Sequence, residues 1–581
     1  MQRRIKRRDA GNDTSLPTDL HPVLKRVYAS RGIESAEQLS YSLEKLHPFT
    51  TLKDIDKAAR ILAEAIEYQK YILIVSDYDA DGATACALGI RGLTAMGAAH
   101  VEYLVPDRFK HGYGLSPVVV DLAMDLNPDI IITVDNGISS IEGVARARAH
   151  GVDVVITDHH LPGNELPDAS AIVNPNQPGD TFPSKAIAGV GVMFYLLAAL
   201  RAELRERNWF ESQGIKEPNL ATYLDLVALG TVADVVPLDY NNRILVSYGI
   251  GLIRTGKSVP GIQALIKVAG KKHAGLVASD LGFSIGPRLN AAGRLSDMSL
   301  GIECLIGNDM NTCHGMAAEL DELNKERKDI QEEMHQQALQ FLSSVGKLEK
   351  QSAEHGICLF NPEWHQGVIG ILASKIKDKL QRPVIIFARD EDGSIKGSAR
   401  SIAGVHIRDI LDRLATTEPG LIMTFGGHAM AAGLTIAETE LERFSILFNE
   451  LIKEHIIAYG LDSDIYTDGC LPAEVINLET AELIRNSGPW GQGFPEPVFD
   501  GTFVVIDKKI VGENHLKLRV KDRDYNRQFD AIAFNTTHRA WPGDVTDLNL
   551  IYKIDVNEYM GRKTAQLIIE YIEPISKSSS D

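Results

Sequence analysis

Between residues 71 and 175 the chain alternates short, continuous apolar runs with longer stretches of helical pattern. The apolar runs are ILIVS (72–76), VEYLV (101–105), DIIITV (129–134), DVVIT (153–157) and AIV (171–173). Such runs are typical of strands buried on both faces, as in a parallel sheet covered by its crossover helices. The alternation therefore predicts an α/β fold built on a parallel sheet, and it restricts the possible folds more than any other feature.

Acidic residues and histidines directly follow three of these runs. The carboxyl ends of parallel strands share one edge of the sheet, and ligands bind at that edge. We therefore expect the side chains that follow the three runs to lie close together. They are Asp77, Asp79 and Asp81 in DYDADG, Asp135 in VDNG, and Asp158, His159 and His160 in TDHH.

Carboxylates crowded at one edge repel one another unless they are protonated or neutralised by cations. Their hard oxygen atoms suit Mg²⁺ or Mn²⁺. Asp234, in GTVADVVP (230–237), adds a further carboxylate, so the sequence offers enough ligands for two cations. Two such ions about 3.5–4 Å apart form a phosphoryl-transfer site that activates water and stabilises an in-line transition state.

Each of these motifs also has a simpler interpretation. An Asp-Gly pair is usually only a turn. An EF-hand loop begins with the same acidic pattern, but it needs Glu at its twelfth position, where this chain has Leu88. Residues 251–258 match the phosphate-loop pattern GxxxxGKS, yet they follow a helical stretch and precede Val259 and Pro260. What indicates a functional site is that aspartate or histidine side chains follow three neighbouring predicted strands.

Downstream, a long helical pattern runs from Asn311 to Val345, without Gly or Pro between Met316 and Ser344. At 1.5 Å per residue it predicts a rod of about 45 Å. New strand-like runs follow at 356–360 and 383–388, so we interpret the helix as a connector to a second α/β lobe.

Alternating strands begin after about residue 464 and predict a small β-barrel. In HLKLRVK (515–521) the apolar and basic side chains fall on opposite faces. The basic face is either a solvated surface or, beside a nuclease-like core, a surface for nucleic acid. It consists of Lys517, Arg519 and Lys521, opposite Leu516, Leu518 and Val520.

The composition limits the class of protein. The 581 residues carry 60 Lys and Arg against 78 Asp and Glu, a net charge of −18, which argues against nonspecific coating of duplex DNA by bulk positive charge. Five scattered cysteines predict neither a disulfide framework nor a cysteine zinc site. We find no export signal and no apolar run of the ~20 residues that span a bilayer, so we expect a cytoplasmic protein without a membrane partner.

In their order and intervals, DYDADG, VDNG, TDHH and GTVADVVPL resemble the signature of the DHH phosphoesterases. The resemblance is strongest to the bacterial exonucleases of that family that degrade single-stranded DNA in the 5′→3′ direction. It covers nearly all of residues 45–575. Further segments that carry it are PDRFKHGYGLSP (106–117), GPRLNAAGRL (286–295), PEWHQGVIGILASK (362–375), GSARSI (397–402), FGGHAMAAGL (425–434) and PWGQGFPEPVFDG (489–501).

The resemblance implies roles for individual residues. The implied ligands of two Mn²⁺ or Mg²⁺ ions are Asp79, Asp81, Asp135, His159 and Asp234, with Asp135 between the ions. Asp77, Asp158 and His160 are implied to be catalytic neighbours of these ligands. Contacts to the DNA backbone and the 5′-phosphate are implied for Arg108, Arg288, Ser398, Arg400 and His428.

The resemblance also implies a domain organisation and a biological role. The expected segments are an N-terminal segment (1–45), a DHH catalytic domain (46–305), a helical connector (306–348), a DHH-associated domain (349–463), an OB-fold-like barrel (464–575) and a tail (576–581). The expected reaction releases 5′-mononucleotides in DNA repair, recombination and mismatch repair. The expected partners are single-stranded DNA and single-strand binding protein, and we expect a monomer.

Two other functions are compatible with parts of the sequence. One is a DHH phosphodiesterase or pyrophosphatase that acts on a small substrate, although such enzymes need only two lobes. The other is a nonenzymatic replication scaffold that has lost its metal site, although every candidate ligand is present here.

Overall fold

The structure is a computed structural model that describes residues 4–575 except 109, 112, 345–354, 391–392, 403, 460–463, 513–514, 524–525, 535, 537–545 and 560. The tail at 576–581 and the expected domain limits at 348/349 and 463 therefore lie outside the described residues. The chain divides into two compact units. The first consists mainly of residues 321–464, and the second of residues 5–293, 297–320 and 465–581.

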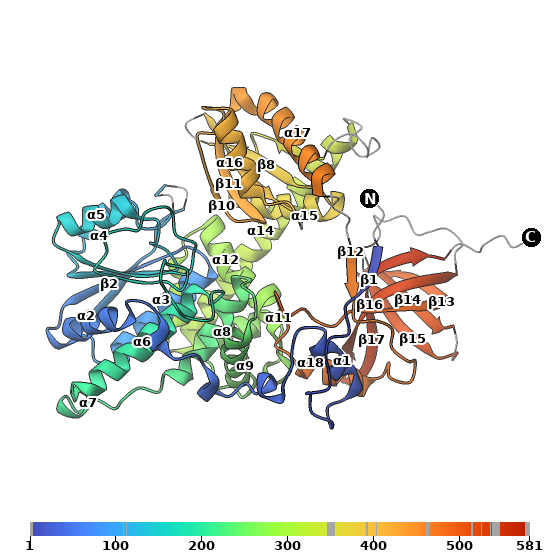
Figure 1. Cartoon of the computed structure of the whole chain (residues 1–581), viewed down its shortest axis with the longest axis horizontal. Helices are drawn as coiled ribbons and strands as arrows, with labels where there is room; N and C mark the ends of the chain where they lie inside the picture. Colours follow the sequence, from blue (N-terminus) through green and yellow to red (C-terminus); the bar gives the residue numbers. More distant parts are fainter. Residues whose placement is uncertain are drawn as a thin grey trace, which may run out of the picture. The chain divides into compact units, whose positions relative to one another are not determined.

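The second unit contains the predicted parallel sheet, in which Figure 1 labels β2. The sheet has five strands in the order β3-β2-β4-β5-β6. Every neighbouring pair is parallel. β2 and β4 are buried as predicted, but β3 is an edge strand with partly exposed side chains, so the expectation of burial on both faces is wrong there. The strands are β2 (Tyr71–Ser76), β3 (His100–Leu104), β4 (Ile130–Val134), β5 (Asp153–Thr157) and β6 (Ala171–Val173).

The strand order reverses next to β2. The chain leaves β2 for β3 on one side and then returns to β4 on the other side. Such a reversal opens a crevice at the carboxyl ends of the two central strands, where open α/β sheets bind ligands. The crossover helices are α3 (Ala80–Ala95), α4 (Pro117–Met124) and α5 (Ile141–Ala149).

Helices complete this part of the unit, and α6 and α8 pack against α3. Residues 251–258, which match the phosphate-loop pattern, run past the end of α9, and Ser258 is buried, so they form no strand-to-helix phosphate loop. The helices are α2 (Ile55–Glu67), α6 (Gly189–Glu206), α7 (Trp209–Ser212), α8 (Leu224–Ala233), α9 (Tyr240–Arg254), α10 (Pro260–Val268), α11 (Ala278–Asp280), α12 (Gly286–Leu295) and α13 (Ser299–Ile306). A π-helix covers Leu281–Ile285.

The predicted long helix is α14 (Met310–Ser344). The first unit holds a mixed sheet in the order β10-β11-β9-β8-β7, with apolar cores on both of its faces. Its strands are β7 (Ile357–Phe360), β8 (Val384–Arg389), β9 (Ser394–Arg400), β10 (Thr424–Gly427) and β11 (Ala431–Ala437), and its helices are α15 (Ile369–Leu380), α16 (Ile407–Thr417) and α17 (Leu441–Tyr459). The second α/β lobe is thus confirmed.

The C-terminal strands close into the predicted barrel, in the order β13-β14-β15-β17-β16. On β14, Leu518 and Val520 lie in its core and Arg519 is exposed, as predicted, whereas Leu516, Lys517 and Lys521 are half-buried. The barrel also packs Val23 and Val27 of α1 (Pro22–Ala29) into its core. Its strands are β13 (Phe499–Val511), β14 (His515–Asp522), β15 (Gln528–Ala533), β16 (Asp547–Tyr559) and β17 (Arg562–Pro574), and α18 (Leu478–Asn486) precedes them.

Two short strands, β1 (Arg4–Arg7) and β12 (Asp464–Thr467), pair with each other. Across the described residues, no helix combines the length and the apolar character needed to cross a membrane.

Candidate metal centre

The DYDADG motif forms the connection from β2 to α3. The Asp79 carboxylate caps α3, because it accepts the backbone N–H groups of Asp81 (2.9 Å) and Gly82 (3.1 Å). A Cβ atom at Gly82 would lie 2.5 Å from the carbonyl oxygen of Asp77, so only glycine permits this tight turn. The motif thus fixes its acidic side chains through local backbone geometry.

Asp81 lies in the first turn of α3 and is 1% exposed. Its carboxylate accepts the backbone N–H groups of Gly189 (2.7 Å) and Val190 (2.9 Å) at the start of α6. A Cβ atom at Gly189 would lie 2.7 Å from Asp135 Oδ1, so α6 reaches both acids only because this residue is glycine.

Asp135 follows β4 with a φ of 62°, in the left-handed region that few residues other than glycine, asparagine and aspartate adopt. The neighbouring Asn136 side chain donates to the carbonyl oxygens of Val75 (3.1 Å) and Val134 (2.9 Å). These bonds join the ends of β2 and β4 and hold the turn that carries Asp135.

Asp158, after β5, orients the two histidines. Its carboxylate accepts the backbone N–H groups of Ile138 (2.9 Å), His159 (2.7 Å) and His160 (3.0 Å). The same carboxylate lies 2.7 Å from His160 Nδ1. Asp158 therefore fixes the backbone of both histidines and one imidazole ring.

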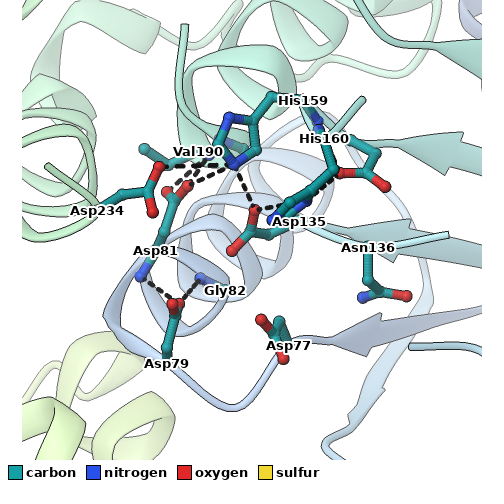
Figure 2. A network of polar contacts seen from close by, with 12 residues as sticks. Asp77, Asp79, Asp81, Gly82, Asp135, Asn136, His159, His160, Val190 and Asp234 are labelled. Atoms are coloured by element: carbon teal, nitrogen blue, oxygen red, sulfur yellow. Dashed lines mark hydrogen bonds and ion pairs between the residues drawn. The ribbon is translucent and has the colours of Figure 1, made fainter. Parts of the chain in front are cut away.

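The predicted side chains converge, as Figure 2 shows. His159 Nε2 lies 3.0 Å from Asp135 Oδ1, 3.5 Å from Asp234 Oδ2 and 4.0 Å from Asp81 Oδ2. The potential ligands form three groups, and within each group the ligand atoms lie within 4.8 Å of one another. Asp135 belongs to two of these groups. The groups are Asp135, His159 and His160; Asp81, His159 and Asp234; and Asp77, Asp79 and Asp135.

The donor chemistry fits divalent cations. Asp135 Oδ1 and Asp234 Oδ2 are buried and accept no hydrogen bond from the residues that the structure describes. Buried carboxylate oxygens without donors are costly unless a cation neutralises them. A set of carboxylate oxygens with one imidazole nitrogen is typical of Mn²⁺ or Mg²⁺ sites.

Burial and mutual repulsion perturb the acids. Burial raises the pKa of Asp77, Asp81 and Asp135 well above its usual range, and neighbouring aspartates raise it further. Burial, with the Asp79 charge, raises the pKa of Asp234 to about 7. Without cations these carboxylates would thus retain protons more readily than exposed ones.

The Asp158–His160 pair behaves in the opposite way. Burial disfavours the charged form of each side chain, but the hydrogen bond between Asp158 and His160 favours the charged forms more strongly. The pKa of Asp158 is therefore lowered, and that of His160 is raised to about 9. The pair therefore favours an ionised carboxylate beside a protonated imidazole.

The residues expected to contact substrate lie in two places. In the second unit, Arg108 lies over the Tyr78 ring (4.6 Å), and Arg288 donates to the carbonyl oxygen of Ser284. In the first unit, Arg400 donates to Ser398 Oγ (3.1 Å) within β9.

The turn that contains His428 adjoins the end of β9. The Ser401 N–H donates to the carbonyl oxygen of Met430 (3.0 Å), and the His428 N–H donates to that of Ala431 (2.8 Å). The structure thus brings Ser398, Arg400 and His428 to one end of the mixed sheet.

Sequence reasoning missed Tyr113. Its hydroxyl donates to the carbonyl oxygen of Asp135 (3.2 Å) and lies 3.4 Å from His160 Nδ1. Burial and nearby acids raise its pKa well above the usual range. Tyr113 lies within the segment 106–117 that carries the resemblance, but no pattern in that segment distinguishes it from its neighbours.

Comparison with known proteins places three family domains on the chain. The N-terminal domain of the DHH family matches residues 71–231. The DHHA1 domain matches residues 354–454, and the RecJ OB domain matches residues 467–571.

Relatives match the chain over nearly its whole length. The single-stranded-DNA-specific exonuclease RecJ of Salmonella typhimurium is 50% identical over 99% of this chain and 100% of its own length. The crystal structure of Thermus thermophilus RecJ with Mn²⁺ has a TM-score of 0.76 at 28% identity, and covers 96% of this chain and 76% of that chain. The structure of the same protein with Mg²⁺ has a TM-score of 0.71 at 28% identity, with 96% and 75% coverage.

Proposed function

The chain belongs to the RecJ family of single-stranded-DNA-specific exonucleases, and from this premise we propose that it hydrolyses single-stranded DNA from the 5′ end and releases 5′-mononucleotides. The observation that carries the proposal is the convergence of Asp81, Asp135 and His159, which follow β2, β4 and β5, with Asp234 at the end of α8. The OB barrel supplies a DNA surface in the same chain.

Asp79, Asp81, Asp135, His159 and Asp234 are the proposed ligands of two divalent cations. Asp135 is the proposed shared ligand: Asp135 and His159 each belong to two of the three ligand groups, and of the two only the carboxylate has two oxygen atoms to offer. When bound, Mn²⁺ or Mg²⁺ ions supply Lewis acidity that lowers the pKa of water and stabilises charge on the phosphate.

The remaining residues of the centre orient groups and hold protons. Asp158 keeps His160 in one ring orientation, with the proton at Nδ1 facing the carboxylate oxygen 2.7 Å away. A protonated His160 stabilises negative charge on the reacting phosphate. The carboxylate of Asp77 adds its charge to the negative field that attracts cations.

Ser398, Arg400 and His428 are the proposed contacts for the terminal 5′-phosphate. Arg400 Nη2 and Ser398 Oγ lie 2.8 and 2.9 Å from the position that a Cβ atom at Gly370 would occupy, in the first turn of α15. A guanidinium, a hydroxyl and a helix N-terminus together favour a phosphate. Arg108 and Arg288 are the proposed contacts for the DNA backbone.

We propose one role for each of the expected domains. Residues 46–305 cleave the DNA, residues 349–463 bind its 5′ end, and residues 464–575 bind the rest of the single strand. We further propose that the protein acts as a cytoplasmic monomer in DNA repair and recombination, with single-strand binding protein as a partner.

Single-stranded DNA labelled at the 3′ end tests the activity. With Mn²⁺ we expect progressive shortening of a strand with a free 5′ end, and none of a strand whose 5′ end is closed by a hairpin. EDTA and Asp135→Asn should both abolish shortening. Asp168→Asn changes an exposed carboxylate and serves as the matched control, which should retain full activity. Equal shortening of both strands would contradict the 5′ polarity.

A further inference from the structure

The turn that carries Asp234 has a strained backbone. The next residue, Val235, has a φ of 64°, a conformation that β-branched residues rarely adopt. The residue is 64% exposed, so packing of Val235 itself does not hold this conformation. A strained conformation persists only where its surroundings determine it.

A segment far along the chain binds this turn. The Leu238 N–H donates to the carbonyl oxygen of Gln492 (2.7 Å). A Cβ atom at Gly491 would lie 2.7 Å from Leu238 Cδ1, and one at Gly493 would lie 3.1 Å from Pro237 Cβ. Glycine at both positions thus permits the close approach. We call residues Trp490–Phe494 the anchor segment.

Arg243 joins the anchor segment to the Asp234 turn. Its Nη1 donates to the carbonyl oxygen of Leu238 (2.9 Å). Its guanidinium carbon lies 4.3 Å from the centre of the Phe494 ring, and the residue is 6% exposed. A cation–π contact is stronger when it is shielded from water in this way.

The anchor segment is itself held by the barrel and the N-terminal helix. The Phe494 ring stacks on Trp490 (5.1 Å), and both rings stack on Tyr28 of α1 (6.3 and 5.8 Å). Trp490 Nε1 donates to the carbonyl oxygen of Ile484 in α18 (2.8 Å). A continuous series of contacts therefore runs from the barrel to the residues that follow Asp234.

We propose that Phe494 and Arg243 are positioning residues for Asp234: by fixing residues 235–238 they keep the Asp234 carboxylate facing His159. The barrel domain then supports the metal centre, in addition to binding DNA. This inference rests on the proposed role of Asp234 as a metal ligand. Residues that support metal ligands typically change metal affinity 10–100-fold when they are substituted.

The test measures Mn²⁺ binding to the full chain without DNA, from the electron paramagnetic resonance signal of free Mn²⁺. Phe494→Leu and Arg243→Met should raise the dissociation constant about tenfold or more, and Arg243→Lys should raise it less. Phe503→Leu is the matched control, because Phe503 is equally buried in the barrel but packs on Tyr552 and Phe529. It should leave the constant unchanged. Circular dichroism at the same temperature confirms that each variant is folded.

Asp234→Asn separates this inference from the ligand assignment. If Asp234→Asn weakens Mn²⁺ binding while Phe494→Leu and both Arg243 variants bind normally, the positioning role is overturned. Weakening by Phe503→Leu to the same extent also overturns it, because the effect is then one of general stability. If Asp234→Asn itself binds Mn²⁺ normally, the ligand assignment fails, and the inference fails with it.

Discussion

Asp225 in α8 and Asp135 after β4 are both almost completely shielded from water, yet their surroundings differ. The Asp225 carboxylate accepts the backbone N–H groups of Leu226 (2.9 Å) and Val259 (2.6 Å), and the latter begins the turn into α10. Asp135 Oδ1 accepts no hydrogen bond from the described residues and lies among other carboxylates. Burial raises the pKa of Asp225 to about 6, whereas for Asp135 neighbouring acids add to burial.

The difference separates a structural acid from a functional one. Backbone donors around Asp225 compensate part of its desolvation, so the carboxylate joins two helices without needing a ligand. At the strand ends, backbone donors to Asp81 and the nearby His159 imidazole compensate only part of the repulsion, so the pKa of Asp81 and Asp135 stays raised, and a divalent cation relieves it. Burial alone thus does not identify a metal site, but burial among like charges does.

The largest expected effect is the loss of activity in Asp135→Asn. Asparagine matches aspartate in shape and adopts positive φ, so the fold should persist. Removal of a ligand shared by two cations should lower the rate at least about 10³-fold, because metal ions contribute several kcal/mol to the transition state. Steady-state cleavage of single-stranded DNA with Mn²⁺ measures this effect.

Although Asp135→Asn should lose its activity, its thermal stability should increase. In EDTA, Asp135→Asn should melt at a higher temperature than the parent, because one buried repelling charge is gone. Asp225→Asn is the control for activity and should cleave DNA at the parental rate. If Asp225→Asn is folded but inactive, Asp225 is not a purely structural acid, and the distinction between Asp225 and Asp135 is wrong.

The pH dependence of stability should report Asp225. Its pKa is about 6 in the folded chain against an ordinary value of 3.8, so the unfolded chain loses this proton first as the pH rises. Stability therefore falls between pH 4 and 6, and the ionised carboxylate lowers the free energy of unfolding by about 3 kcal/mol above that range. Asp225→Asn lacks this decrease. Relative to the parent, the variant should gain about 3 kcal/mol between pH 4 and 7 in urea unfolding in EDTA.

Mn²⁺ should stabilise the folded chain by binding to the strand-end region and not near Asp225. A cation that binds only the folded chain adds about 2.7 kcal/mol at one hundred times its dissociation constant. Calorimetry should show this increase in the parent and in Asp225→Asn, and a much smaller one in Asp135→Asn. Equal stabilisation of all three proteins would place the ions elsewhere.

The sequence was sufficient to predict the sheet and the acids at its edge. β2, β4 and β5 are continuous apolar runs, and the chain order of such runs with their crossovers leaves few possible arrangements. The residues that follow these strands had to meet at one edge, so Asp81, Asp135 and His159 could be placed together from the sequence alone.

Features that depend on contacts between distant segments were not predictable. The strand β15 (QFDAIA) lacks a clear alternating pattern and takes its place from its neighbours in the barrel. The helix α1 has an ordinary amphipathic sequence, and nothing in it indicates that Val23 and Val27 pack into a barrel formed by the other end of the chain. The approach of Gly189 to Asp135 likewise depends on where α6 lies.

Asp158 combines properties of both regions, and its substitution should lower activity less than that of Asp135. It lies beside the metal centre, yet like Asp225 it accepts backbone N–H groups, and the His160 imidazole keeps its pKa low. In Asp158→Asn the amide retains one acceptor oxygen, so part of this network is lost and both histidines lose their fixed orientation. We expect a 10–100-fold loss in Mn²⁺ affinity and in cleavage rate, as for other residues that orient ligands.

The comparison with His160→Gln determines how Asp158 acts. If Asp158 serves only to orient His160, the two single variants and the double variant should lose the same activity, because residues that act as a unit are not additive. If it also orients His159, Asp158→Asn should weaken Mn²⁺ binding while His160→Gln leaves it nearly unchanged. Two backbone bonds from His159 and His160 to one carboxylate oxygen favour the second result, since they fix the ligand histidine independently of the His160 ring. Normal Mn²⁺ affinity in Asp158→Asn would contradict it and would limit the role of Asp158 to orienting His160.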